Sequence, residues 1–240
     1  MDLLLLAFAA LAVSFATFFT GFGLGTLLTP LLLLWAPVEV AIGLTALVHL
    51  ANNLFKVAIL PVRPPRAVLL RFGLPAVVSA WLGSWLLNRI GAADIMPPIL
   101  GVVLMLLAML ELIPAVRRWQ FSSKALPVGG ILSGFLGGLT GNQGALRSAF
   151  LVRSGLSKEA LVASTVAISL GVDLTRISVY AQQWSNLNWA DYGVVLATAG
   201  IPALVGSILG RQYLPKIRLE RMEQAVSVGL FAVGLYLALG

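Results

Sequence analysis

The chain has 240 residues, of which 59% are hydrophobic and 10% are charged. A soluble domain carries about 25% charged residues, so this composition excludes a water-soluble fold and predicts an all-α integral membrane protein. The sequence has no cysteine and one histidine, His49, which excludes disulfides, cysteine nucleophiles and histidine-rich metal sites. In a membrane protein, the net charge of +7 is typical of cytoplasmic anchoring residues rather than of nucleic-acid binding.

The first apolar stretch, residues 2–36, is interrupted by the glycine-rich segment Thr20–Gly25. It begins without a cationic region and has no cleavage motif, so we interpret it as mature structure rather than a signal peptide. Glycine favours breaks in helices. The pattern therefore predicts a helix, a tight break and a shorter returning helix.

A second apolar stretch, residues 125–154, is broken in the same way at Thr140–Gly144. A helix that spans a bilayer needs about 20 apolar residues. By this measure the full-length spans are predicted at 38–60, 66–88, 95–113, 158–182, 190–210 and 218–239. With the longer arm of each broken hairpin, they make about eight hydrophobic helices.

Basic residues indicate which loops face the cytoplasm. They gather at the 61–65 turn, in the 114–124 linker and before the last helix, whereas the loop near 183–191 has none. The 61–65 turn is therefore predicted inside and its counterpart near 183–188 outside. This difference predicts that the two halves are inverted relative to each other and that both termini lie outside.

The two halves also align at a fixed offset of 120 residues. The matched pairs are Thr20 with Thr140, Gly21 with Gly141, Glu39 with Glu159, Thr45 with Thr165, Asn53 with Asp173 and Lys56 with Arg176. We therefore predict two inverted repeats, each a glycine-broken hairpin plus three spanning helices. The first repeat is residues 1–113, the cytoplasmic linker is 114–124, and the second repeat is 125–240. Paired helix breaks of this kind are the best sequence pointer to the binding site of a secondary transporter.

The glycine-rich hairpin that runs from Gly21-Phe22-Gly23-Leu24-Gly25 to Pro30-Leu31, with its second copy, resembles the sulfite exporter TauE/SafE family. The second copy keeps Gly141 and Gly144 but has Asn142, Gln143 and Arg147, and Phe150 stands where the family has its second proline. The resemblance covers nearly the whole chain. It implies transport of sulfur-containing anions such as sulfite, sulfoacetate or other organosulfonates.

The helix breaks are the predicted substrate-binding site, because an anion in the membrane needs donors that replace its water. A broken helix exposes N–H groups and a positive helix end. Hydroxyl and amide side chains at the breaks add further donors. The predicted substrate-binding residues are Thr20, Gly21, Gly23, Gly25, Thr140, Gly141, Asn142, Gln143, Gly144 and Arg147. The alternative is tight helix packing through the glycines at 130, 134 and 138.

Arg147 lies inside an apolar stretch, so it should face protein, water or the anion itself. The alternative is that its side chain extends to the membrane interface.

A second group of polar residues is predicted to serve in gating or coupling. On helix 38–60, helical spacing places His49 on one polar face with Asn52, Asn53 and Lys56. On helix 158–182, Asp173 and Arg176 share a face. The full set is His49, Asn52, Asn53, Lys56, Asp173 and Arg176. The structural alternatives are a hydrogen-bonding strut for His49, an interfacial anchor for Lys56 and an intramembrane ion pair for Asp173 with Arg176.

These features predict a secondary transporter that moves a small anion by alternating access of the two repeats, coupled to protons or to the membrane potential. The rivals are an anion channel, a membrane enzyme and a membrane subunit of a larger complex. No nucleotide-binding loop is present, and we expect no cofactor, metal or catalytic residue. The expected partners are the anion and the lipid bilayer, and we expect no nucleic acid. The sequence leaves open whether the chain forms a homo-oligomer. The expected location is a bacterial inner membrane, which the chain crosses several times.

Overall fold

The structure, a computed structural model, describes residues 3–20, 24–33, 36–59, 62–90, 96–113, 124–141, 143–152, 154–181, 184, 189–213 and 219–239. Within these ranges every regular element is a helix, which confirms the predicted all-α class. The elements are α1 (Leu3–Thr20), α2 (Leu24–Leu32), α3 (Val38–Ile59), α4 (Arg66–Val68), η1 (Leu69–Gly73), α5 (Leu74–Ile90), α6 (Met96–Leu112), α8 (Leu126–Thr140), α9 (Gly144–Val152), α10 (Lys158–Tyr180), α11 (Trp189–Tyr213) and α12 (Leu219–Leu239).

The apolar runs account for most helix bounds. Within the described ranges, four helices are long and apolar enough to cross a membrane: Val40–Ala58, Arg66–Arg89, Glu159–Tyr180 and Tyr192–Tyr213. α6 and α12 coincide with the predicted spans 95–113 and 218–239, and their described apolar parts are Pro97–Met109 and Gln224–Leu239. Large apolar side chains such as Leu4, Phe8 and Leu70 are exposed, as lipid contact requires, whereas many polar side chains are buried.

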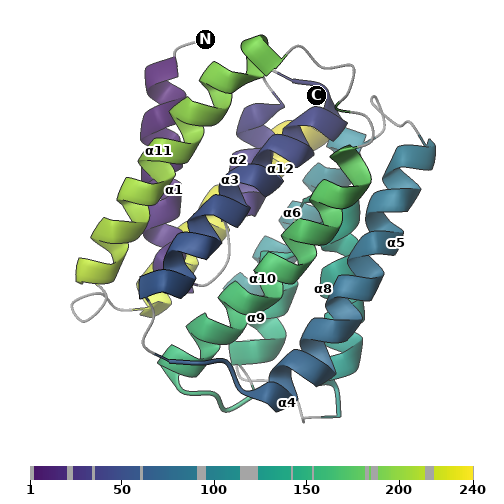
Figure 1. The fold of residues 1–240 in the computed structure, drawn as a ribbon, viewed down its shortest axis with the longest axis vertical. Helices are drawn as coiled ribbons and strands as arrows, with labels where there is room; N and C mark the ends of the chain where they lie inside the picture. The colour runs from purple at the N-terminus through teal and green to yellow at the C-terminus, as the bar shows by residue number, and fades with distance from the viewer. Residues whose placement is uncertain are drawn as a thin grey trace.

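Helices that correspond in the two predicted repeats pack against each other. α3 contacts α10, and α6 contacts α12. In both pairs the early part of one helix meets the late part of the other, as in the approach of Gly101 to Gly234 and Ala238. Each pair is therefore antiparallel, the arrangement that the predicted inverted repeats would produce. Figure 1 shows α3 and α10 running in opposite directions through the middle of the bundle.

The remaining long helices pair across the repeats. α1 packs on α11, and its counterpart α8 packs on α5, which is the counterpart of α11. Each predicted repeat thus has its first helix packed against a helix of the other predicted repeat. In Figure 1, α4 and the end of α11 lie at the lower end of the bundle, whereas the chain termini lie at the upper end. The basic turn before α4 and the basic stretch after α11 therefore adjoin the same end, which we predict to be cytoplasmic.

The α5–α8 seam is built on glycines of α8. A Cβ atom added at Gly130, Gly134 or Gly138 would meet the carbonyl oxygen of Phe72, Ala76 or Ala80 within 2.3 Å. These glycines therefore let two helix backbones approach closely. For them, the packing interpretation holds.

We expect Gly134→Ala to destabilise the protein by about 1–3 kcal/mol, because overpacking forces the two backbones apart. The added Cβ would lie 2.0 Å from the Ala76 carbonyl oxygen. Gly229→Ala in α12 is the matched control, since nothing lies within 4 Å of its added Cβ. Unfolding in mixed detergent measures both; equal stability of the two variants would contradict the tight seam.

Candidate functional site: a buried polar network at the crossing of α3 and α10

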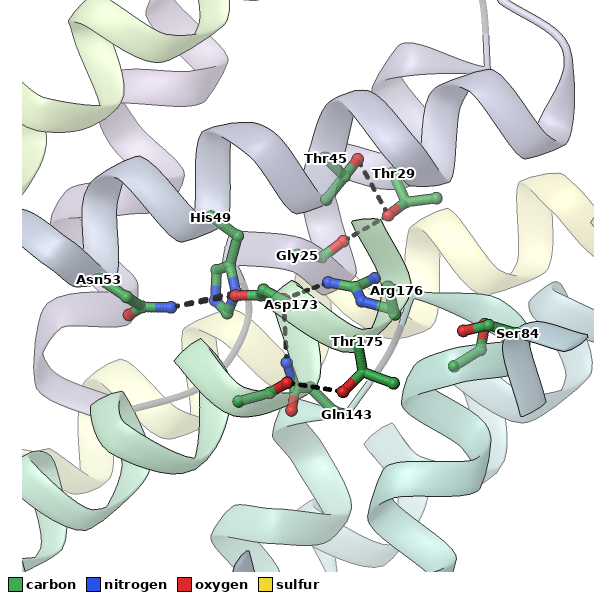
Figure 2. A network of polar contacts seen from close by, with 12 residues as sticks. Gly25, Thr29, Thr45, His49, Asn53, Ser84, Gln143, Asp173, Thr175 and Arg176 are labelled. Carbon is green, nitrogen blue, oxygen red and sulfur yellow. Dashed lines mark hydrogen bonds and ion pairs between the residues drawn. The ribbon is translucent and has the colours of Figure 1, made fainter. Parts of the chain in front are cut away.

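Asp173 of α10 is the centre of a buried polar network, and its side chain is fully buried. Its Oδ2 atom lies 2.6 Å from His49 Nδ1 of α3 and accepts a hydrogen bond from Asn53 Nδ2 at 3.4 Å. His49 and Asn53 are four residues apart, so one face of α3 presents both of them. Figure 2 shows the two side chains converging on the carboxylate. The network therefore joins α3 and α10, which correspond in the two predicted repeats.

The other carboxylate oxygen contacts Arg176 and the second helix break. Asp173 Oδ1 accepts from Arg176 Nη2, one turn along α10, and from Gln143 Nε2 at 3.3 Å. Gln143 Oε1 in turn accepts from Arg147 Nη1 at 3.0 Å. Hence the predicted intramembrane ion pair between Asp173 and Arg176 is present. We call this set the Asp173 network: His49, Asn53, Gln143, Arg147, Asp173 and Arg176.

Both hairpins reach this centre. Gly141 ends α8 with φ of +80°, a left-handed conformation that suits glycine, and its N–H donates to the Gly137 carbonyl. Its carbonyl oxygen lies 3.2 Å from the Cβ position of Gly25 in α2. Thr29 of α2 donates to the Gly25 carbonyl at 2.7 Å, and its hydroxyl oxygen lies 3.2 Å from the Thr45 hydroxyl of α3 (Figure 2). The start of α2 therefore touches the end of α8 beside the network.

The contact with Asp173 determines which ring nitrogen of His49 carries the hydrogen. A carboxylate only accepts hydrogen bonds, so His49 Nδ1 carries the hydrogen that points to Asp173. The other ring nitrogen, Nε2, is then left to accept a hydrogen bond or a proton from elsewhere. This orientation is the one a histidine needs to exchange a proton while its carboxylate partner holds it in place.

Lys56 adds a further cation next to the network. Its side chain is buried, 7% exposed, and its Nζ lies 5.4 Å from the centre of the Phe18 ring. This burial is unlike that of an interfacial anchor. Arg147 and Arg176 are likewise buried, so three buried cationic side chains lie in or next to the network, which contains one carboxylate in the described part of the chain. An excess of buried positive charge is costly unless an anion or water compensates for it.

Arg176 also has donors to spare. Its Nε and Nη1 atoms are buried and make no hydrogen bond with any described residue. A buried donor without a partner costs about 1–3 kcal/mol. The Nη1 atom lies 3.3 Å from the Cβ position of Gly141, at the second break. The unpaired N–H groups of Arg176 therefore lie next to Gly141, which has no side chain to fill the space beside them.

The structure places one predicted site residue, Asn52, outside the network. Asn52 belongs to another contact, because it donates to Ser14 of α1 at 3.4 Å and accepts from Ser207 of α11 at 2.6 Å. Thr140 donates to Leu136 in its own helix at 2.8 Å. Gly144 is buried at the start of α9. The side chain of Thr20 and residues Gly21, Gly23 and Asn142 lie outside what the structure describes.

Sequence reasoning missed Thr29, Thr45 and Ser169 as site residues. Thr45 had a usable signal, since it is one of the residues that match at the 120-residue offset. Ser169 had one too, because it is the counterpart of His49 at the same offset. Thr29 is matched by Ala149, so nothing in the alignment points to it. As for metals, no three His, Cys, Asp or Glu side chains gather within the described ranges.

Comparison with known proteins adds the family. No curated protein and no solved structure gives a significant match. The family model described as sulfite exporter TauE/SafE matches residues 6–237, nearly the whole chain. That family consists of membrane transporters rather than enzymes. The match, the lipid-facing apolar surface and the buried polar centre agree, and the chain belongs to the sulfite exporter TauE/SafE family of membrane anion exporters.

Proposed function

We propose that the chain is a secondary transporter that moves a small anion, namely sulfite, sulfoacetate or another organosulfonate, past the Asp173 network. The observation that carries this proposal is the buried excess of cations. Arg147 and Arg176 lie close to a single carboxylate, Asp173, at the crossing of α3 and α10. An anion that loses its water in the membrane needs such charges and donors in its place.

The arrangement of the repeats supports alternating access. The central helices α3 and α10 are antiparallel counterparts, and the Asp173 network ties them together. Residues 1–113 and 125–240 would act as the two moving units, joined by the 114–124 linker. Rocking of one repeat against the other would expose the centre to one side at a time.

Coupling to protons would use the pair of His49 and Asp173. The 2.6 Å contact between His49 Nδ1 and Asp173 Oδ2 links a group that titrates near neutral pH to the charged centre. Protonation of this pair would add positive charge where the anion binds. The membrane potential is the other source of coupling. We place the protein in a bacterial inner membrane, as a multi-pass protein.

The rival functions make different predictions. An anion channel would use the same cations, but its flux would rise steeply with voltage and would not saturate at low substrate concentration. A membrane subunit of a larger complex would need its partner for activity. Saturable, gradient-stimulated flux by the isolated chain would favour the transporter over both.

We expect Arg147→Ala to lower the initial rate of anion uptake by at least about tenfold, because a hydrogen bond to a charged group contributes about 1.5–3 kcal/mol. Arg147 is 1% exposed and bonded to Gln143 in the centre of the protein. The measurement is uptake of labelled sulfite and sulfoacetate into proteoliposomes, with and without a pH gradient.

Arg66→Ala is the matched control, since it removes an arginine that is exposed at the start of α4. It should leave uptake unchanged. Equal uptake by parent and Arg147→Ala would return Arg147 to a structural role. No flux of either anion in the parent would contradict the proposed substrate class.

A further inference from the structure

A pocket opens beside the Asp173 network, between α1, α2, α3 and α10. The polar residues in its lining are Thr17, His49, Asn53, Lys56, Thr165 and Ser169, and apolar side chains complete the wall. None of the described lining residues carries a carboxylate. It includes the late part of α3 and the early part of α10, on the side of the basic turn at 61–66, which we predict to be cytoplasmic.

Among the described residues, Lys56 is the only lysine or arginine in this lining. Its ammonium group contacts the face of the Phe18 ring, and no carboxylate in the described part of the chain pairs with it. Arg147 repels it from the side of the network. A buried ammonium under repulsion, with only an aromatic partner, is stabilised when an anion enters the space beside it.

Ser169 is an independent sign of a ligand. Its side chain is 1% exposed, lines the pocket, and its hydroxyl has no hydrogen-bond partner among the described residues. Buried hydroxyls in native proteins are nearly always bonded. A hydroxyl that faces a pocket next to an ammonium group is a donor ready for an oxygen of an anion.

We propose that this pocket is an oxyanion-binding site, in which Lys56 supplies the charge and Ser169 a hydroxyl donor. The ligand is a small oxyanion with several acceptor oxygens, such as the sulfite group or the sulfonate end of a larger molecule. The site is the cytoplasmic waiting position from which the anion passes His49 to reach Arg147 and Arg176. This inference rests on the proposed transport function and adds a second binding position to it.

The pocket lies on the Lys56 side because matched residues of the two predicted repeats make different contacts. At the 120-residue offset, Lys56 corresponds to Arg176 and Asn53 to Asp173. In the other half these two counterparts bind each other, and Tyr180 donates to the Gly138 carbonyl at 2.7 Å beside them. The counterpart region is therefore closed by its own contacts, whereas Lys56 is left facing the pocket. Exchange of these two arrangements is what alternating access requires.

The test is binding and transport of sulfite by the parent and Lys56→Gln. We expect Lys56→Gln to weaken sulfite binding to the purified protein, measured by calorimetry, by about tenfold or more, because a charge-assisted contact is lost. In proteoliposomes its half-saturation concentration should rise by a similar factor, while the maximal rate stays within about twofold. Ser169→Ala should weaken binding in the same direction by a smaller factor.

Lys124→Gln is the matched control, because it removes an exposed lysine near the linker. It should behave like the parent. If the parent binds and transports sulfite and Lys56→Gln does so equally well, the pocket inference is overturned and the transport function stands. If Lys56→Gln fails to fold, Ser169→Ala decides, and unchanged binding there overturns the site. If the parent neither binds nor transports sulfite or sulfoacetate, the proposed function itself fails.

Discussion

Replacing Asp173 by asparagine should both abolish transport and destabilise the protein. The carboxylate is fully buried and receives donors from four side chains, those of His49, Asn53, Gln143 and Arg176. An asparagine offers one oxygen and one NH2 group. At least one donor would therefore face another donor. Breaking a buried ion pair by removing one partner costs about 3–5 kcal/mol.

The same change leaves Arg147 and Arg176 without the carboxylate that the network supplies. Without the negative charge of Asp173, these cations would hold a bound anion too tightly for it to be released. We expect uptake of labelled sulfite to fall to the background of empty liposomes, and thermal unfolding in detergent to shift to lower temperature.

Glu159→Gln is the control, since Glu159 is exposed in the first turn of α10, on the same helix. There the loss of a carboxylate costs only about 0.3–1 kcal/mol of interaction with the helix dipole. Normal uptake by Asp173→Asn would exclude the network from the transport path. Normal stability with lost uptake would mean that the carboxylate serves transport alone.

The bounds of several helices could be predicted because the bilayer sets the length of an apolar run. The range 38–60 became Val38–Ile59, and 218–239 became Leu219–Leu239. The π-helical turn η1 could not be predicted, because no periodic pattern marks it. Pro75 follows it in the second position of α5, where it lacks the N–H of an α-helical bond.

The site could be predicted in its residues but not in its contacts. Asp173 and Arg176 are three apart on one helix, so local geometry was enough to pair them. His49 and Asp173 are 124 positions apart, and only the packing of α3 on α10 brings them together. Asn52 was grouped with Asn53, but neighbours on a helix point about 100° apart. One therefore faces Asp173, and the other faces Ser14 and Ser207.

Two glycines with the same backbone conformation allow a sharp test of the second helix break. Gly141 has φ of +80° and Gly155 has φ of +76°. An added Cβ at Gly141 would lie 2.9 Å from Thr29 Oγ1 and 3.3 Å from Arg176 Nη1. At Gly155, nothing lies within 4 Å. The two positions thus share the backbone strain and differ in what the new methyl group meets.

We expect Gly141→Ala and Gly155→Ala each to lose about 1–2 kcal/mol of stability, because an L-residue in the left-handed region is strained at both positions. Gly141→Ala should in addition lower sulfite uptake by at least about tenfold, since the methyl group pushes on Thr29 and on the guanidinium of Arg176. Uptake per folded protein, with the folded fraction measured in detergent, separates the two effects.

The comparison has an outcome that would sink the idea. Equal uptake per folded protein in Gly141→Ala and Gly155→Ala would mean that the break needs only its backbone conformation and that Arg176 tolerates displacement. Selective loss of uptake in Gly141→Ala would instead indicate that the anion binds where α8 ends. At that position Arg176 has N–H groups that are unpaired among the described residues, and the start of α2 contacts the carbonyl of Gly141. That place is where both hairpins meet, so a single methyl group there tests whether the paired breaks serve transport or only packing.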